Sequence, residues 1–300
     1  MKPAPMTLGR HRFDWSRPVL LGVLNVTEDS FSDGGKFLSP DAAIAHGLAL
    51  CEQGADIIDV GAESTRPGAR AVVAEQERAR VVAVIEALSK RGVLVSVDTT
   101  KELVARAAFE AGALVLNDVA MGDSLERLAP IVARFEGCYL RMHARGTPST
   151  MRSDPALTSY PDGVVRAVKR ALLEDCATIE RLGVARSRVV IDPGIGFAKS
   201  APQSLELLGS VRELVATGYA VCVGPSRKSF IDAAGAYDES WGVFSSSPDE
   251  RAGGTAAAVT ASVLQGAHML RVHDVAVMRQ AARVAHAIAR AQRQREAEAR

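Results

Sequence analysis

The sequence predicts an α/β protein folded as a single (β/α)8 TIM barrel, and three observations favour this fold. Eight short aliphatic runs alternate with longer amphipathic segments, and such continuous Val, Ile and Leu runs are typical of parallel strands buried on both faces. Division of the 300 residues by eight gives about 37 residues per unit, which suits a strand–helix repeat with some long loops. None of the runs has the less hydrophobic composition of an edge strand, so we favour a closed barrel over an open, doubly wound sheet.

The predicted elements follow one another in a regular order. Helices are expected at Asp41–Gln53, Ala74–Lys90 and Lys101–Ala111, among others. This order divides the chain into an N-terminal extension (1–17), the barrel (18–290) and a charged C-terminal tail (291–300). The strands are expected at Val19–Val26, Ala55–Val60, Val93–Val97, Leu114–Leu116, Cys138–Met142, Arg188–Ile191, Tyr219–Val223 and Met269–Val272.

Residues at the ends of the helical segments support the same boundaries. The stretches Ser39–Asp41, Thr99–Glu102 and Gly122–Ser124 have the composition of helix starts. Glycine favours the left-handed conformation that commonly ends a helix. Glycines fall between a helical segment and the next strand at Gly54, Gly92, Gly112, Gly137, Gly183, Gly218 and Gly266.

The composition is that of an ordinary globular protein. Lys and Arg number 36 against 35 Asp and Glu, and hydrophobic residues make up 47% with only 5% aromatic. This near-neutral balance gives no support for a nucleic-acid partner, which would need an excess of basic residues. We find no signal peptide and no apolar stretch of membrane-spanning length, and four scattered cysteines that we interpret as buried free thiols. We therefore expect a cytoplasmic protein without a membrane contact.

Several connections that follow the strands are longer than a simple reversal needs, namely 28–40, 62–73 and 144–161, and 234–254 interrupts the segment before the last strand. In a (β/α)8 barrel these loops open on the face where active sites lie. We assign no function to 234–254. Polar residues end the strands at this face: Asn25, Asp59, Glu63, Asp98, Asn117, Asp118, His143, Asp192, Ser226, Arg227, Lys228, Arg271, His273 and Asp274.

Two groups among these residues have a chemical character. Acids and an amide at Asp98, Asn117 and Asp192, with Lys228, suit a flat heterocycle that presents N–H and C=O groups along one edge. Arg271 and His273 suit an anion such as phosphate or pyrophosphate, beside Asn25 as a possible ligand of a divalent ion. A helix-capping role for any single acid, and a salt-bridged rim for Arg271–Asp274, remain open as simpler explanations.

Other chemistries lack their motifs. No glycine-rich dinucleotide fingerprint, P-loop or nucleophile elbow occurs, and the six histidines include no His-x-x-x-His pair.

The ordered set of motifs resembles the dihydropteroate synthases of the pterin-binding family, over about Leu20 to Ala285. Two long signatures carry most of the specificity, at Gly22–Gly35 and Asp59–Gly68. Shorter ones follow in the family's order at Ser96–Thr99, Leu116–Asp118, Asp192–Lys199, Ser226–Ser229 and Arg271–Asp274. Two positions depart from the pattern without loss of a functional side chain: Ala198, where many members have glycine, and Pro225.

The resemblance implies a reaction of folate biosynthesis. Para-aminobenzoate displaces pyrophosphate from 6-hydroxymethyl-7,8-dihydropterin pyrophosphate, which gives 7,8-dihydropteroate, and sulfonamides compete for the aminobenzoate position. It also implies a Mg²⁺ cofactor and a homodimer. The electron-rich pterin stabilises positive charge on the departing methylene, so an SN1-like path is reasonable, and the loops 28–37 and 62–70 would exclude water.

The resemblance also implies a role for particular residues. The pterin is assigned to Asp98, Asn117, Met142, Asp192, Gly224, Lys228 and Arg271; the pyrophosphate to Asn25, Thr65, Arg66, Arg271 and His273, with Mg²⁺ at Asn25; and the aminobenzoate to Phe31, Thr65, Arg66, Pro67, Phe197, Ser226 and Lys228. Catalytic roles fall to Asp33, Arg66 and Lys228. Our hypothesis is that Asp33 offsets charge on the cation or pairs with Arg66, so Asp33→Asn would lower turnover more than pterin affinity.

Two rival functions remain at this stage. One is another pterin-binding barrel, such as the methyltetrahydrofolate-binding part of corrinoid methyltransferases. That relative would not need Ser226–Lys228, Thr65–Pro67 or a pyrophosphate pocket, all of which this sequence offers. The other is a catalytically silent paralogue, which the loss of a residue in the first two loops would mark; no such loss is present.

Overall fold

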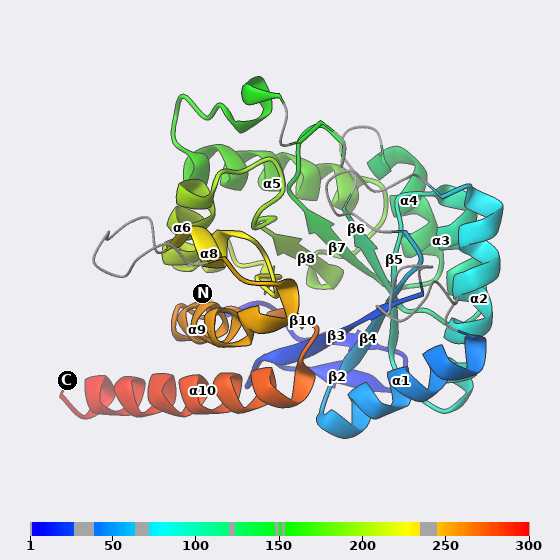
Figure 1. Cartoon of the computed structure of the whole chain (residues 1–300), viewed down its shortest axis with the longest axis horizontal. Coiled ribbons are helices and arrows are strands. Elements are labelled where there is room, and N and C mark those ends of the chain that lie inside the picture. Colours follow the sequence, from blue (N-terminus) through cyan, green and yellow to red (C-terminus); the bar gives the residue numbers. More distant parts are fainter. Residues whose placement is uncertain are drawn as a thin grey trace.

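The computed structural model describes residues 2–26, 39–63, 72–119, 124–147, 150–151, 154–234 and 245–299. Eight parallel strands close into a barrel in the order β10-β3-β4-β5-β6-β7-β8-β9, which confirms the predicted fold (Figure 1). The strands are β3 (Val19–Asn25), β4 (Ile57–Gly61), β5 (Val95–Asp98), β6 (Val115–Asp118), β7 (Cys138–Met142), β8 (Val189–Asp192), β9 (Ala220–Val223) and β10 (Met269–Val272).

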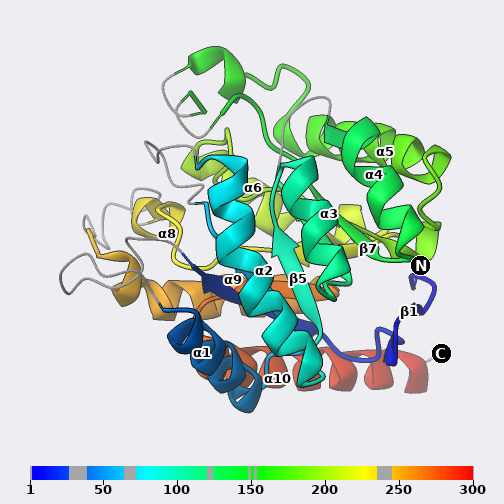
Figure 2. The same cartoon turned by 90° about the vertical axis from the view of Figure 1, so that its right-hand side faces the viewer.

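Helices surround the strands, and α9 and α10 pack side by side where the chain returns to close the barrel (Figures 1 and 2). Short 3₁₀ turns lie at Pro155–Thr158, Arg186–Arg188 and Pro248–Arg251. The α-helices are α1 (Pro40–Gln53), α2 (Ala74–Lys90), α3 (Glu102–Glu110), α4 (Ser124–Arg134), α5 (Val164–Arg181), α6 (Ala201–Gly209), α7 (Val211–Val215), α8 (Phe230–Ala233), α9 (Ala252–Leu264) and α10 (Val275–Glu298).

Most of the predicted helix ends are found, with two differences. The Ser39 side chain caps α1 by accepting a hydrogen bond from the Ala42 N–H at 3.2 Å, and Gly54 ends that helix at φ +106°. Helix α3 begins only at Glu102, and Lys101 at its cap position makes no side-chain cap; the Thr99 hydroxyl donates to Glu77 and accepts from the Lys101 N–H at 3.2 Å. Before β7 the left-handed residue is Glu136, at φ +50°, and not the predicted Gly137. Gly122 and Asp123 lie outside the described residues.

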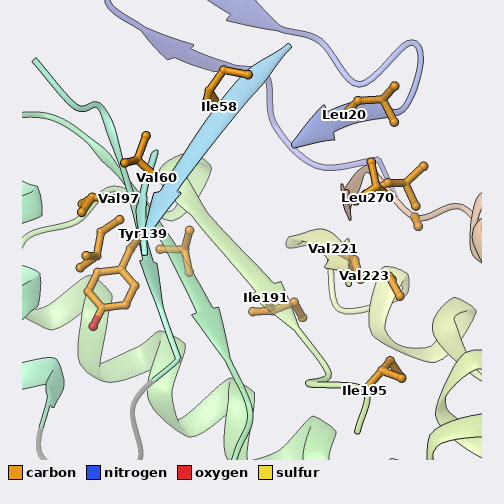
Figure 3. Close-up of a cluster of buried hydrophobic side chains, with 14 of the residues drawn as sticks. Leu20, Ile58, Val60, Val97, Tyr139, Ile191, Ile195, Val221, Val223 and Leu270 are labelled. Carbon is orange, nitrogen blue, oxygen red and sulfur yellow. The ribbon is translucent and has the colours of Figure 1, made fainter. Parts of the chain in front are cut away.

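Alternation along the strands separates two apolar layers. One contains strand and helix side chains together and fills the space between the barrel and its helices; Figure 3 shows ten of its labelled members, among them Leu20, Ile58, Tyr139 and Leu270. The other draws on no described helix and fills the inside of the barrel at the end where the strands begin, with Leu21, Ile57 and Val190 among its members. The strands therefore bury apolar side chains on both faces at that end.

The first residues of the chain cover this end of the barrel. Strands β1 (Met6–Leu8) and β2 (His11–Phe13) form an antiparallel hairpin. Met6 and Leu8 are fully buried in the interior cluster, and the Trp15 ring lies at their side with its Nε1–H bonded to the Ala4 carbonyl at 2.9 Å. The segment predicted only as an extension is thus a plug, which Met6 and Leu8 at alternating positions and Trp15 after the hairpin attach to the barrel.

The C-terminal helix ends in exposed residues, and the cysteines form no disulfide. Helix α10 continues to Glu298, and its last described residues, 291–299, are all exposed. All four cysteines are free; Cys138, Cys176 and Cys222 are buried and Cys51 is half-buried. Among the described helices, none combines the length and the apolar character that a membrane crossing requires.

Candidate active site

The polar strand ends predicted from the sequence meet at the opposite end of the barrel from the hairpin. Register fixes this meeting, because Asp59 of β4 lies beside Ser96 of β5, Asp98 beside Asn117 of β6, and Met142 of β7 beside Asp192 of β8. All of these residues are inside the barrel or at its mouth. The interior changes from apolar to polar about halfway along the strands.

Arg271 is at the centre of the first polar cluster. Its Nε donates to Asp59 Oδ2 at 2.7 Å and its Nη2 donates to Asp98 Oδ2 at 2.7 Å. Asp59 Oδ2 also accepts a hydrogen bond from Asn117 Nδ2 at 3.0 Å. The sequence assigns Arg271 to an anion or a heterocycle. In the structure its guanidinium is held by two acids. Within the described part of the chain, Arg271 Nη1 makes no hydrogen bond.

Burial in this cluster shifts the pKa of Asp98. Burial raises the pKa of Asp98 to about 7, against the opposing effect of the Arg271 charge. Near neutral pH the Asp98 carboxyl is therefore divided between its acceptor-only and its donor form. Two buried side-chain atoms of the described residues have no hydrogen-bond partner, Asp59 Oδ1 and Ser96 Oγ, and they belong to neighbouring strands in the same layer.

Asp192 and Lys228 form a second cluster on the other side of the mouth. Asp192 Oδ1 accepts a hydrogen bond from the Gly194 N–H at 2.7 Å, and burial raises the pKa of this carboxyl. Lys228 donates to the Ile195 carbonyl, and its Nζ lies 4.3 Å from the centre of the Phe197 ring. Burial lowers the pKa of Lys228 to about 8, with Asp192 opposing the shift. Lys228 is therefore a cation that loses its proton within reach of physiological pH.

Gly224 and Met142 complete the inner surface of the mouth beside the two clusters. A side-chain carbon added to Gly224 would lie 3.6 Å from Arg271 Cβ and 3.7 Å from Asp192 Oδ2, so Gly224 is between the two clusters. Met142 is buried beside Asp192 in the β7–β8 register. The predicted pterin residues Asp98, Asn117, Met142, Asp192, Gly224, Lys228 and Arg271 are thus gathered at one mouth.

The loop after β9 and the end of β10 are tied together beside this mouth. Ser226 Oγ accepts a hydrogen bond from the His273 N–H at 3.2 Å and lies 3.0 Å from His273 Nδ1. Arg227 makes a bidentate pair with Asp274, with bonds of 3.0 and 2.6 Å. The rim of salt bridges left open by the sequence is therefore made by Arg227 and Asp274, whereas Arg271 points into the barrel.

A buried lysine that the sequence did not single out holds the loop after β8. Lys199 Nζ donates to the carbonyls of Phe197 at 2.9 Å and His143 at 3.1 Å, and lies 3.0 Å from His143 Nδ1. Burial lowers the pKa of His143 to about 2, with the Lys199 charge acting in the same direction, so this imidazole is neutral. Only glycine fits at 194, because an added side-chain carbon would approach the His143 carbonyl oxygen to 1.9 Å at φ +67°.

Ala198, the departure from the family pattern, also has a structural account. It is fully buried at φ +47°, a left-handed conformation in which glycine is favoured. Its carbonyl accepts a hydrogen bond from the Tyr160 hydroxyl at 3.1 Å, which attaches the loop to the connection after β7.

Some polar strand ends do not belong to these two clusters. Asp118 is fully buried but bonds to Ser124, Tyr139 and Arg141, on the side of the strands that faces the helices. Glu63 pairs with Lys101, which also pairs with the buried Glu77 of α2. Asn25 ends β3 and is half-buried. Phe31, Asp33, Thr65, Arg66 and Pro67 lie outside the described residues.

The mouth of this parallel barrel carries acids, an amide and cations with open donor and acceptor atoms. This arrangement defines a (β/α)8 enzyme that binds a polar heterocycle. The chain belongs to the pterin-binding enzyme family, because the profile of that family, described as "Pterin binding enzyme", matches residues 21–273. The resemblance stated from the sequence motifs is therefore confirmed.

Individual relatives agree with this assignment. A dihydropteroate synthase of Synechocystis sp. is 38% identical over 290 residues, which cover 95% of this chain and 96% of that protein. The dihydropteroate synthase of Yersinia pestis in a sulfonamide drug complex superposes with a TM-score of 0.83 at 34% identity, covering 95% of this chain and 98% of the other. That of Xanthomonas albilineans in complex with 7,8-dihydropteroate superposes with a TM-score of 0.79 at 35% identity and the same coverage.

Proposed function

We propose that the chain catalyses the dihydropteroate synthase reaction, in which para-aminobenzoate displaces pyrophosphate from 6-hydroxymethyl-7,8-dihydropterin pyrophosphate. The chain is a transferase of this type by its relatives. The observation that carries the proposal for this chain is the buried pair of clusters at the barrel mouth. Their open atoms include acceptors on Asp98 and Asn117 and donors on Arg271 and Lys228, a pattern that complements a pterin edge.

In this proposal the pterin lies in the mouth between the two clusters. Asp98 and Asn117 accept hydrogen bonds from the N–H groups of the ring, and Asp192 accepts from the other side. Lys228 and Arg271 donate to the ring's carbonyl and imine atoms. Asn117 and Asp192 are buried, and the partly buried Asp98, Lys228 and Arg271 are already held by hydrogen bonds, so the donors and acceptors are preorganised before the ligand arrives.

We assign the aminobenzoate to the wall formed by Phe197, Ser226 and the aliphatic part of Lys228. The Phe197 ring beside Lys228 offers an apolar face, and Ser226 is fixed by its hydrogen bond with His273. The X. albilineans relative bound to 7,8-dihydropteroate supports a site that accepts both halves of this product. The Y. pestis relative bound to a sulfonamide drug supports competition by sulfonamides at the aminobenzoate position.

We assign the pyrophosphate and Mg²⁺ to the seam between β10 and β3, with Asn25 and His273 as the described contributors. An amide oxygen such as that of Asn25 is a suitable hard ligand for Mg²⁺. No group of three or more His, Cys, Asp or Glu residues that would hold a metal occurs among the described residues. This donor set fits an ion that takes most of its ligands from pyrophosphate and water. The bound ion would offset negative charge on the leaving group.

The reaction needs no protein nucleophile. The C–O bond between the methylene and pyrophosphate breaks, the pterin stabilises the resulting positive charge, and the aminobenzoate nitrogen adds to the methylene and loses a proton. The described residues orient the ring and, through Lys228, place a cation near the reacting end. The hydrogen bonds from Lys199 to the His143 and Phe197 carbonyls hold Phe197 in place while this occurs.

One assay tests the proposed function. The purified protein is given dihydropterin pyrophosphate, Mg²⁺ and labelled para-aminobenzoate, and labelled dihydropteroate and released pyrophosphate are measured in equal amounts. A folded protein that binds the pterin but forms no product would contradict the enzyme assignment and favour the silent paralogue. Transfer of a methyl group from methyltetrahydrofolate, without dihydropteroate synthesis, would favour the methyltransferase alternative.

We also propose that the enzyme is a homodimer, as the family resemblance implies, and that it lies in the cytoplasm, as expected from the sequence. Val277, Val284 and Ile288 leave an exposed apolar stripe on one face of α10, which supports packing against a second copy. The unpaired buried thiols suit a reducing compartment. Sedimentation velocity of the purified protein tests the dimer, and a monomer at micromolar concentration would contradict it.

A further inference from the structure

We propose that Asp59, which neither the sequence motifs nor the proposed roles assign to the ligand, is a positioning residue that fixes which atoms of Asn117 and Arg271 face the heterocycle. This inference rests on the proposed function and deepens it, because it identifies what sets the hydrogen-bonding pattern that the site recognises.

The position of Asp59 in the barrel makes this role possible. It is fully buried on β4, and both β6, which carries Asn117, and β10, which carries Arg271, are two strands away from β4 in the barrel order. A single oxygen, Asp59 Oδ2, accepts from Asn117 Nδ2 at 3.0 Å and from Arg271 Nε at 2.7 Å. One carboxylate therefore joins two ligand-facing side chains from opposite directions.

The bond to Asn117 decides how its amide is oriented. A carboxylate accepts hydrogen bonds but does not donate them, so the amide must turn its NH₂ group toward Asp59. The Asn117 oxygen is then left for a donor on the ligand, and it has no other partner in the described structure. A reversed amide would place two acceptors against each other in a buried site.

The bond to Arg271 has the parallel consequence for the guanidinium. With Nε held by Asp59 and Nη2 by Asp98, the plane of the group is fixed, and Nη1 is its open donor in the described structure. The ligand edge must then offer an N–H to Asn117 and an acceptor to Arg271. A heterocycle with the opposite order of donor and acceptor would meet like groups at both atoms.

Asp118 provides a matched comparison within the same fold. It is also a fully buried strand acid, but it accepts from three side chains, against two for Asp59, and those partners lie between the barrel and the helices. If Asp59 stabilised only the fold, its replacement would act as replacement of Asp118 does. A positioning role predicts instead a change confined to pterin binding.

The first experiment compares Asp59→Val, Asp59→Asn and Asp118→Asn. Binding of 6-hydroxymethyl-7,8-dihydropterin is measured by titration calorimetry, and KM is measured for both substrates. We expect Asp59→Val to weaken pterin binding by about tenfold or more and to leave the aminobenzoate KM within about twofold. Asp59→Asn retains an oxygen for both donors and should stay within about threefold of the original affinity; Asp118→Asn should leave pterin affinity unchanged.

A second pair of variants keeps the test decisive if Asp59→Val fails to fold. Asn117→Asp places two carboxylates together and should weaken pterin binding by about tenfold or more. Adding Asp59→Asn replaces the repulsion by an amide–carboxylate hydrogen bond with exchanged roles, but the one atom of residue 59 that meets both partners can then no longer accept from Arg271 Nε, so affinity should recover only in part.

The outcomes separate this inference from the proposed function. If the unmodified protein does not bind the dihydropterin, the proposed function fails. If it binds, the inference is overturned by normal pterin affinity in Asp59→Val, by equal losses in Asp59→Asn and Asp59→Val, or by a double variant no better than Asn117→Asp.

Discussion

The two ends of the barrel interior are built from the same strands and solve different problems. At the end that the hairpin covers, Leu21, Ile57 and their neighbours form an apolar cluster closed by Met6 and Leu8. At the other end, the same strands carry Asp59, Asp98 and Arg271, joined by charge-assisted hydrogen bonds. Asp59 is as fully buried as Leu21 and Ile57, so burial alone does not distinguish a stabilising region from a binding region. The distinguishing feature is the unpartnered polar atoms.

The unpartnered polar atoms at the mouth reduce the free energy of unfolding. A buried polar group without a hydrogen bond costs stability, and the two in the described structure, Asp59 Oδ1 and Ser96 Oγ, both lie toward the mouth. The hairpin end contributes stability that the mouth does not. We therefore expect substitutions at the two ends to separate stability from activity, and the following predictions are arranged by decreasing size of effect.

The largest effect on the fold is expected at the hairpin end. Leu8→Ala should destabilise the protein by about 2–5 kcal/mol, because a fully buried side chain leaves a cavity at the bottom of the barrel. The activity of each folded molecule should stay the same, since Leu8 belongs to the apolar cluster at the opposite end of the barrel. Urea unfolding followed by an activity assay at low temperature measures both quantities. A large loss of activity without a loss of stability would break the comparison.

The converse is expected for Asp98→Ala at the mouth. Removal of this carboxylate should lower kcat/KM for the pterin substrate by about 10- to 150-fold, the effect of losing one or two charge-assisted hydrogen bonds. Stability should be unchanged or higher, because a carboxylate that is costly to bury is removed and Arg271 still pairs with Asp59. Steady-state kinetics and thermal unfolding measure the two effects. A variant that unfolds more easily would show that Asp98 is a structural group.

The pH dependence of activity should report on both clusters at the mouth. As pH falls below about 7, Asp98 gains a proton and ceases to be a pure acceptor; as pH rises above about 8, Lys228 loses its charge. We expect kcat/KM for the pterin substrate to be maximal between these values and to fall about tenfold per pH unit on either side. In Asp98→Asn the acidic limb should disappear. An acidic limb that persists in that variant would assign it to another group.

The smallest effect is expected at Ala198. Its left-handed conformation costs about 1–2 kcal/mol for a residue with a side chain, whereas glycine adopts it freely but loses more chain entropy on folding. Ala198→Gly should therefore raise stability by up to about 1 kcal/mol. Ala185→Gly is the matched control, because Ala185 has φ −62° and the change there should destabilise. Differential scanning calorimetry compares them, and a lower melting temperature for Ala198→Gly would contradict the strain.

Sequence patterns alone predicted most of the fold. Helix α2 was predicted at Ala74–Lys90 and has those bounds, and the eight strands lie at the expected places, because aliphatic runs and amphipathic periodicity depend on neighbouring residues. The hairpin was missed because Met6 and Leu8 form too short a pattern to distinguish a plug from a flexible extension. Their burial depends on the barrel floor, which distant strands build.

The site was predicted in composition and less well in its contacts. The residues that meet at the mouth were named correctly as polar strand ends, since parallel strands end at one face. The sequence assigned Asn117 to the ligand and gave Asp118 no such role, but it did not predict the contacts that turn Asn117 inward and Asp118 toward the helices. The pairing of Arg271 with Asp59 depends on which strands face each other across the barrel. The hydrogen bonds of Lys199 depend on the path of the loop after β8.

The hairpin plug and the closure of the barrel have a consequence for how the chain folds during synthesis. Strand β3 pairs with β10, and the floor that receives Met6 and Leu8 includes Met269. About 250 residues separate Val19 from Met269, its partner in the register, so at roughly 5–20 residues per second the ribosome needs roughly 12–50 s between them. During that interval β3 has an open edge and the plug has an incomplete floor. The first segment to be made is therefore among the last that can dock, and the nascent chain carries apolar side chains and an unpaired strand edge that suit capture by a chaperone.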